Sequence, residues 1–407
     1  MKNQNSFSLL IKPASADCNL RCEYCFYIDH LDPNQIKTRM SDNVLKTMIF
    51  KFMQTNQPQY AFGWQGGEPT LMGLEFFKKV VNFQQKFGKK GMNVANGLQT
   101  NGTLINDEMA VFFRKYNFLL GVSLDGPAYI HDKYRKNIGG KPTHSRVLNG
   151  INILRKNNVE FNILTLVTNE NVKKPEDLYR YFKENGFNFL QFIPCVEFDQ
   201  NNHLLPYSIS GEDWGNFLNK IFDEWIKNDT KSISIRLFDS ILEYIVYRSY
   251  NVCQMGDNCC KYFVVEYNGN VYPCDFFVQD DLKLGNILTS KWKDFLNSPI
   301  YLKFGTQKAT WNNLCQTCPF LELCHGDCQK NRVGTPNIST KTLSVLCKGW
   351  KMFYAHSLPE LIKLAVKFKT ERKIKNKVPI LGLKLNRKDL CPCGSGKKYE
   401  QCCMYEY

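Results

Sequence analysis

Short hydrophobic runs alternate with longer amphipathic segments through the first half of the chain. The runs have the length of buried strands and cover residues 7–11, 60–64, 94–98, 118–124, 161–167 and 189–193. The segments between them have helical periodicity and cover residues 42–55, 74–87, 106–116, 145–157 and 175–185. Ser41 and Asn106 precede two of these segments and are suitable helix caps. The alternation predicts an α/β fold with a parallel sheet and right-handed crossovers, either an open doubly wound sheet or an incomplete barrel.

Loops rich in cysteine, glycine and polar residues follow most of the predicted strands. They lie at residues 18–25, 65–69, 99–102, 123–126 and 168–169. In both sheet architectures ligands bind at the carboxyl ends of parallel strands. The sequence therefore predicts one site along this edge of the sheet.

The second half of the chain has a different organisation. Amphipathic segments at 211–228 and 236–249 precede a hairpin that turns at 268–269, a further turn with a short helix around 284–287, and a helix over 351–368. We expect five parts: a front domain over 1–195, a helical linker over 196–252, a cysteine-rich domain over 253–368, a basic linker over 369–385 and a small motif over 386–407.

Composition places the chain among ordinary globular proteins, with 43% hydrophobic and 22% charged residues. No hydrophobic run approaches the ~18 residues of a membrane span, and the first residues lack the apolar core of a signal peptide, so we expect a cytoplasmic protein. The net charge is +15, and residues 363–388 hold ten of the basic residues. Such a charge favours acidic partners, nucleic acid included, or is simply a solvated lysine surface.

The chain has 17 cysteines, and in a cytosolic protein this number indicates metal binding or catalysis rather than disulfides. Cys18, Cys22 and Cys25 share one loop after the first predicted strand. Three thiolates suit an iron–sulfur cluster whose fourth iron stays open to a small molecule. The alternative is a zinc knuckle that takes its fourth ligand from elsewhere, with His30 nearby.

The C-x3-C-x2-C spacing with Phe26 after it, together with the Gly-Gly-Glu-Pro run at 66–69, resembles the radical S-adenosylmethionine (SAM) enzymes. The resemblance implies a partial (β/α)6 barrel and a 4Fe–4S cluster on Cys18, Cys22 and Cys25, which cleaves SAM to a 5′-deoxyadenosyl radical. It also implies a set of SAM contacts, namely Tyr24, Gly66, Gly67, Glu68, Ser123, Arg135 and Val196. On the residues alone the two glycines are equally suited to a simple turn, Ser123 to capping a strand end, and Arg135 to a charged loop.

Nine further cysteines lie between residues 253 and 347, and eight of them are enough for two four-thiolate sites, either zinc ribbons or iron–sulfur clusters. Their irregular spacing resembles the twin-cluster SPASM domain of radical SAM peptide modifiers. The resemblance implies one auxiliary 4Fe–4S cluster on Cys253, Cys259, Cys274 and Cys328. It implies a second on Cys315, Cys318, Cys324 and Cys347. Cys260 adjoins Cys259, and the spacing from Cys253 favours Cys259 as the ligand.

The segments 8–13, 65–70, 98–103 and 272–276 extend the resemblance to the anaerobic sulfatase-maturating enzymes, over residues 6–365. Membership implies oxidation of a cysteine or serine in an unfolded sulfatase to Cα-formylglycine, with a low-potential reductant such as flavodoxin or ferredoxin. Asp275, next to Cys274, then becomes the general base, although an aspartate here also suits a turn. Tyr27 and Gln65 become candidates to bind the substrate peptide. His131 and Asp125 are weaker candidates, and Cys195 is expected to be a small buried apolar residue.

The carboxyl-terminal motif C-x-C-x8-C-C, with a Gly-Ser-Gly turn, resembles the SEC-C zinc module. It implies one zinc on Cys391, Cys393, Cys402 and Cys403, where the alternative is a disordered tail with incidental cysteines. By analogy the motif could contact the export machinery or the ribosome. Two other functions remain open: a SPASM enzyme that cross-links or epimerises a ribosomal peptide, and a non-catalytic protein that binds zinc and nucleic acid.

Overall fold

The structure, a computed structural model, describes residues 6–30, 38–332 and 343–371, with positions 388, 398 and 401. The chain divides into two compact units, one formed by residues 1–164 and 258–306 and the other by 165–257 and 307–407. The four cysteines of the carboxyl-terminal motif and most of the basic linker lie outside the described residues.

The first unit is built on a sheet in the order β10-β9-β8-β1-β2-β3-β4-β5. Every neighbouring pair from β8 to β5 is parallel, whereas β8-β9 and β9-β10 are antiparallel. The strands are β1 (Ser8–Lys12), β2 (Tyr60–Trp64), β3 (Val94–Thr100), β4 (Leu119–Ser123), β5 (Phe161–Val167), β8 (Tyr262–Glu266), β9 (Asn270–Tyr272) and β10 (Gly285–Asn286). The parallel sheet and the hairpin at 268–269 are therefore confirmed. The sequence did not reveal that β8 pairs with β1, so that the hairpin extends the sheet of the front region.

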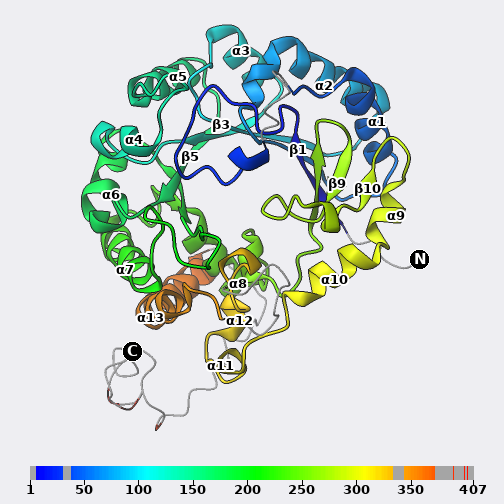
Figure 1. Cartoon of the computed structure of the whole chain (residues 1–407). Coiled ribbons are helices and arrows are strands. Elements are labelled where there is room, and N and C mark those ends of the chain that lie inside the picture. Colours follow the sequence, from blue (N-terminus) through cyan, green and yellow to red (C-terminus); the bar gives the residue numbers. More distant parts are fainter. Residues whose placement is uncertain are drawn as a thin grey trace. The chain divides into compact units, whose positions relative to one another are not determined.

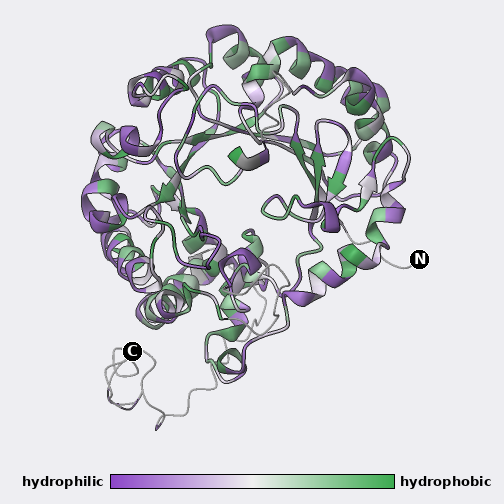
Figure 2. Ribbon diagram, in the orientation of Figure 1, coloured by the Kyte–Doolittle hydropathy of each residue, from purple (hydrophilic) through white to green (hydrophobic). Residues whose placement is uncertain are grey.

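Helices pack on this sheet through apolar stripes, and α1, α2 and α3 lie along the same side of the strands (Figure 1). The helices are α1 (Asp42–Met53), α2 (Gly73–Phe87), α3 (Asp107–Lys115), α4 (Ala128–Tyr134), α5 (His144–Lys156), α9 (Trp292–Leu296) and α10 (Pro299–Gln307). Hydrophobic and hydrophilic residues share each helix (Figure 2), and α2 buries Phe76, Phe77, Val80 and Val81. The Ser41 and Asn106 side chains accept hydrogen bonds from backbone N–H groups of α1 and α3, as expected of caps.

The structure of this unit differs from the sequence interpretation in two places. The predicted short helix around 284–287 is the strand β10, which pairs with β9 through Gly285 and Asn286. Two residues are too few for periodicity to distinguish a strand from a helix. The periodicity also did not predict α4, a helix of seven residues; Arg135, expected in a charged loop, directly follows this helix and is buried.

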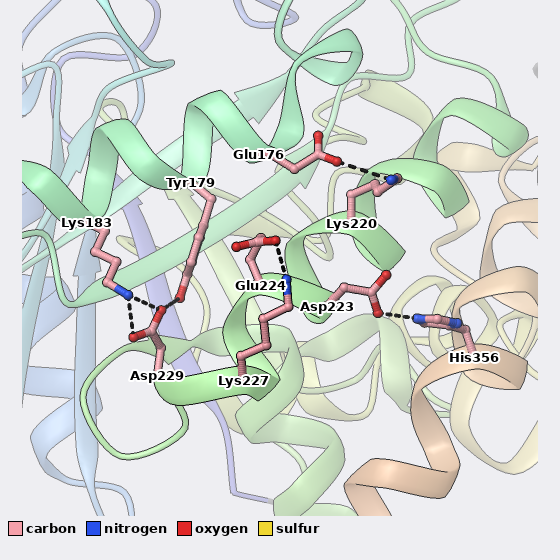
Figure 3. Close-up of polar contacts among 9 residues, drawn as sticks. All are labelled: Glu176, Tyr179, Lys183, Lys220, Asp223, Glu224, Lys227, Asp229 and His356. Carbon is pink, nitrogen blue, oxygen red and sulfur yellow. Dashed lines mark hydrogen bonds and ion pairs between the residues drawn. The ribbon is translucent and has the colours of Figure 1, made fainter.

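The second unit contains one pair of parallel strands, β6 and β7, and several helices. Its elements are α6 (Pro175–Glu184), β6 (Phe189–Pro194), α7 (Gly211–Asn228), β7 (Ser234–Ile235), α8 (Arg236–Tyr247), α11 (Asn313–Gln316), α12 (Leu321–Cys324) and α13 (Cys347–Glu371). The expected helices at 211–228, 236–249 and 351–368 are all present. Figure 3 shows polar contacts that join α6, α7 and α13, among them Tyr179 and Lys183 of α6, which both bond to Asp229.

Within the described part of the chain, no helix is both long and apolar enough to cross a membrane. The cysteines that the structure describes form no disulfide. Cys195 is buried, as expected of a small apolar residue.

Candidate active site

The loop between β1 and the short helical turn η1 (Ile28–His30) holds Cys18, Cys22 and Cys25. Burial, followed by the charge of Glu68, raises the pKa of the Cys18 thiol to about 12, and burial likewise raises the pKa of Cys22. The sulfur of Cys18 lies 3.3 Å from the N–H of Leu20, which donates to it. These thiols are therefore neutral near pH 7 unless a metal centre displaces their protons.

Glu68 fixes the loop after β2 to the end of β3. Its carboxylate is buried and accepts hydrogen bonds from the Thr70 N–H (3.0 Å), the Thr70 and Thr100 hydroxyls (2.6 and 2.8 Å) and the Asn101 N–H (2.7 Å). Burial raises the pKa of Glu68, and the hydrogen bonds oppose this shift without cancelling it. Four donors on one carboxylate give Glu68 a structural role beside the cysteine loop.

Gly66 and Gly67 lie so close to neighbouring residues that neither position has room for a Cβ atom. Both glycines have positive φ angles, +88° and +50°. A Cβ on Gly66 would lie 2.7 Å from the side-chain Cδ of Lys12, and one on Gly67 would clash with the carbonyl oxygen of Asp17. The two glycines thus allow the loop after β2 to pack against β1 and against the start of the cysteine loop.

A buried polar group lies on the other side of the cysteine loop. The Tyr24 hydroxyl donates to the Asp125 carboxylate and accepts from Arg135 Nη1 at 2.9 Å. Arg135 Nε is buried without a hydrogen-bond partner, which fits a site that receives a polar ligand. His131, by contrast, uses both ring nitrogens within the protein, on the Asp125 N–H and the Thr143 hydroxyl.

Ser123 ends β4 and is half-buried. Val196 lies in the second unit, where it is buried and its carbonyl accepts from Lys330 Nζ at 2.7 Å.

Asp275, the base expected from the sequence, directly follows Cys274. Its carboxylate accepts from Gln65 Nε2 at 3.0 Å and from the Tyr262 hydroxyl at 3.2 Å. The same hydroxyl lies 3.3 Å from the sulfur of Cys274. The structure therefore brings together Gln65, Asp275 and Cys274, three residues singled out from the sequence, and adds Tyr262.

Lys12 is the main residue of this site that the sequence did not reveal. Its side chain is 1% exposed, and its ammonium lies 3.8 Å from the centre of the Tyr27 ring. Burial lowers the pKa of Lys12, and the charges of Asp275, Glu266, Cys274 and Cys25 oppose that shift. The Tyr27 hydroxyl donates to Glu266, whose Oε2 is buried without a partner. The buried ammonium of Lys12 thus lies near the carboxylates of Glu266 and Asp275 and the thiols of Cys25 and Cys274.

The expected ligands of the second auxiliary cluster line one cavity in the second unit. Its lining includes Cys315, Cys318, Cys324 and Cys347 together with Trp350 and Tyr354. Among the described residues, no three Cys, His, Asp or Glu side chains converge as ligands of a single ion. Each thiolate of a four-iron cluster binds a different iron, so thiols spread around a cavity fit such a cluster.

The expected ligands of the first auxiliary cluster come from both units: Cys259 and Cys274 from the first, Cys253 and Cys328 from the second. Cys260 is engaged by the protein itself, because its thiol donates to the Tyr301 carbonyl at 3.4 Å. This engagement of the Cys260 thiol supports Cys259 rather than Cys260 as the ligand.

Comparisons with known proteins match three families along the chain. The radical SAM superfamily matches residues 13–182, an iron–sulfur cluster-binding domain (SPASM) matches 253–319, and the SEC-C motif matches 387–404. The chain is 38% identical to the cysteine-type anaerobic sulfatase-maturating enzyme of Clostridium novyi, over 88% of this chain and 97% of that protein. The chain belongs to the anaerobic sulfatase-maturating enzymes.

A serine-type sulfatase-maturating enzyme of Bacteroides thetaiotaomicron is 40% identical, over 86% of this chain and 89% of that protein. A solved sulfatase-maturating enzyme, anSMEcpe with bound AdoMet and Cp18Cys peptide, matches with a TM-score of 0.83 at 38% identity, over 89% of this chain and all of that one. The predicted radical SAM fold with a SPASM domain is thereby confirmed, and family membership implies SAM and iron–sulfur clusters as cofactors.

Proposed function

We propose that this chain oxidises a cysteine or serine of an unfolded sulfatase polypeptide to Cα-formylglycine. The observation that carries the proposal is the position of Asp275. Its carboxylate is oriented by Gln65 and Tyr262, and Tyr262 also contacts the sulfur of Cys274. A proton acceptor is therefore held beside a proposed ligand of the electron acceptor, which suits an oxidation that removes one proton and one electron from a substrate radical.

The residues of the chain have distinct tasks in this reaction. When bound, SAM and the clusters supply the radical that takes a Cβ hydrogen and accept the electron that the substrate then loses. Asp275 takes the proton from the substrate thiol or hydroxyl through a carboxylate oxygen. A serine then gives the aldehyde directly, whereas a cysteine gives a thioaldehyde that water converts to the aldehyde with release of hydrogen sulfide. Gln65 Nε2 and the Tyr262 hydroxyl hold that carboxylate in one orientation. The Tyr27 ring is held in place by the hydrogen bond of its hydroxyl to Glu266 and by the Lys12 ammonium over the ring. The substrate peptide is positioned against this ring.

The cofactors would be held by the residue sets expected from the sequence. Cys18, Cys22 and Cys25 would hold the cluster that binds SAM, and the unpartnered Arg135 Nε supports a polar ligand next to Tyr24. Gly66, Gly67, Glu68, Ser123 and Val196 complete the proposed SAM contacts. The cavity with four thiols supports the second auxiliary cluster, and the engaged thiol of Cys260 supports Cys259 in the first.

Three further parts of the proposal concern the surroundings of the enzyme. A low-potential donor such as flavodoxin or ferredoxin would reduce the cluster that binds SAM. The SEC-C match at residues 387–404 supports one zinc on the four terminal cysteines. A tail of that kind would contact the export machinery or the ribosome, and the enzyme would act in the cytoplasm on chains that have not yet folded.

The test is anaerobic incubation of the reconstituted full chain with SAM, a reductant and two peptides that differ only in a cysteine or serine at the target position. Mass spectrometry should show conversion of the target side chain to an aldehyde. A thioether cross-link or an epimer in its place would contradict the proposal and favour the alternative peptide modifiers.

Asp275→Asn tests the base, because asparagine keeps the size of the side chain but cannot take the proton. We expect full iron content and continued SAM cleavage, with formylglycine formation reduced by ~10²–10⁴-fold. Asp280→Asn, at an exposed aspartate of the same segment, is the matched control and should leave the rate unchanged. Near-normal product from Asp275→Asn would eliminate the base assignment.

A further inference from the structure

The segment between Cys324 and Cys328 has an unusual backbone. His325, Gly326 and Asp327 have φ angles of +43°, +72° and +63°, so three consecutive residues are left-handed. Two of the three carry a Cβ and are disfavoured in this region. Such a conformation persists only where surrounding contacts impose it.

Two basic side chains impose it through the carbonyl groups of the segment. Lys308 Nζ donates to the His325 and Asp327 carbonyls at 2.9 and 2.7 Å, and to the Gln254 carbonyl at 3.2 Å. Arg332 Nε donates to the Gly326 carbonyl at 2.9 Å, and Nη2 donates to the carbonyls of His325 at 3.1 Å and Lys308 at 2.8 Å. The carbonyls of all three left-handed residues are thus bound by two cations.

Lys308 is only 1% exposed. Moving an ammonium group from water into a protein is costly, and carbonyl dipoles compensate for the lost water without cancelling the positive charge. The buried charge lies next to a cluster ligand, because the two carbonyls that it binds flank Gly326, which lines the cavity of Cys315, Cys318, Cys324 and Cys347. The charge of Lys308 lowers the pKa of Cys324, although burial and the charge of Asp327 together keep that pKa raised.

We propose that Lys308 and Arg332 form a cationic clamp that raises the reduction potential of the cluster held by Cys324. The inference rests on the proposed assignment of Cys324 to the second auxiliary cluster. Reduction adds one electron, and therefore one negative charge, to the cluster. A fixed cation in a poorly hydrated environment stabilises the reduced form, and an anion such as the buried Asp327 carboxylate opposes it. The clamp therefore makes this cluster an acceptor for electrons that leave the active site.

Lys351 provides a matched control, because it lines the same cavity but is exposed to solvent. Water screens an exposed charge far more effectively than a buried one. Lys308→Met and Lys351→Met remove the same charge from the same cluster environment, and they differ chiefly in burial. Asp327→Asn removes the opposing charge and keeps one side-chain oxygen for its donors Asn331 and Ser344.

The experiment is a potentiometric titration of the reconstituted full chain, followed by electron paramagnetic resonance and accompanied by iron analysis. The relevant signal is the one that Cys315→Ala abolishes. For Lys308→Met we expect this cluster to be about tenfold harder to reduce, which is a ~59 mV shift to more negative potential for one electron. Lys351→Met should shift it much less, and Asp327→Asn should shift it in the positive direction.

Equal shifts for Lys308→Met and Lys351→Met, or unchanged potentials in Lys308→Met and Asp327→Asn, would overturn the proposal. If Lys308→Met loses iron, the sign of the shift in Asp327→Asn decides the question alone, and a negative shift refutes it. A wild-type chain with no iron signal that depends on Cys315 would overturn the cluster assignment itself, and the clamp proposal with it.

Discussion

Lys12 shows how one residue can organise a site although the motif that contains it gives no sign of that role. Its ammonium is the buried cation next to the Tyr27 ring and close to Glu266 and Asp275. The aliphatic part of the Lys12 side chain occupies the space that a Cβ atom on Gly66 would need. Removing the charge would leave buried carboxylates without compensation, a more costly state than the paired one.

We therefore expect Lys12→Met to keep SAM cleavage while formylglycine formation falls on the order of tenfold, which corresponds to ~1.4 kcal/mol of barrier. The measurement is the ratio of 5′-deoxyadenosine to formylglycine, which should rise. Lys78→Met, at an exposed lysine of α2, is the control and should leave the ratio unchanged. An unchanged ratio in Lys12→Met would show that its charge has no part in the reaction.

The site residues predicted from the sequence were those in recognisable motifs. Gln65 and Asp275 do meet, although 210 positions separate them. Lys12 and Glu266 were missed because each ends a hydrophobic strand, and only the parallel pairing of β1 with β8 places them opposite each other. Tyr262 was missed for the same reason. The partners of a buried charge depend on strand register, which a single sequence does not give.

At the scale of elements, Gly67 tests how the loop after β2 supports the cysteine loop. Gly67→Ala should displace the Asp17 backbone, because the new Cβ would clash with its carbonyl. We expect loss of the cluster on Cys18, Cys22 and Cys25, measured as about four fewer irons per chain, and with it loss of SAM cleavage.

Gly91→Ala is the matched control, since Gly91 also has positive φ, +89°, but nothing lies within 4 Å of its Cβ position. Both substitutions strain the backbone, so the difference between them isolates the clash. Equal iron contents in the two variants would show that backbone packing at Gly67 does not hold the cysteine loop.

The helix α4 contains a buried group that makes stability depend on pH. Burial, and then the charges of Arg135 and His144, lower the pKa of His131 to about 2. In the unfolded chain a histidine titrates near pH 6.5. Below that pH His131 therefore binds a proton in the unfolded state but stays neutral in the folded state. The contribution of neutral His131 to stability is complete above about pH 6.5 and decreases as pH falls, by ~1.4 kcal/mol per pH unit.

Wild type should therefore lose about 2–3 kcal/mol more than His131→Gln between pH 6.5 and 4.5. Urea unfolding at a series of pH values measures this difference. His203→Gln, at an exposed histidine, should follow the wild type. Parallel curves for wild type and His131→Gln would mean that His131 is protonated within the fold.

Most elements could be predicted, because five-residue apolar runs and amphipathic segments have distinct periods. The predicted strand at 60–64 and helix at 211–228 coincide with β2 and α7. Among the elements that were not predicted, α4 and β10 have seven and two residues and too few apolar positions to establish a period. Tertiary contacts stabilise them instead: Ile130, His131 and Tyr134 of α4 are buried.

At the scale of the whole molecule, each compact unit combines segments that are far apart in the sequence. Residues 258–306 follow the linker in sequence but belong to the first unit, since β8 pairs with β1. Long-range strand pairing is information that local sequence patterns do not contain.

The last prediction concerns the carboxyl-terminal segment. α13 ends at Glu371, and the SEC-C match begins at residue 387, so deletion of residues 372–407 removes the motif without cutting a described helix. If the terminal cysteines bind one zinc and three four-iron clusters lie elsewhere, the full chain should contain about twelve irons and one zinc. The truncated chain should keep its iron, lose its zinc and oxidise the target peptide at an unchanged rate. Elemental analysis and the peptide assay measure both quantities on the same samples.

Full iron content with lost peptide turnover would show that the tail takes part in catalysis or substrate capture. Zinc retained after truncation would place the zinc site among the cysteines before residue 372, and the assignment of the zinc to the tail would then be wrong.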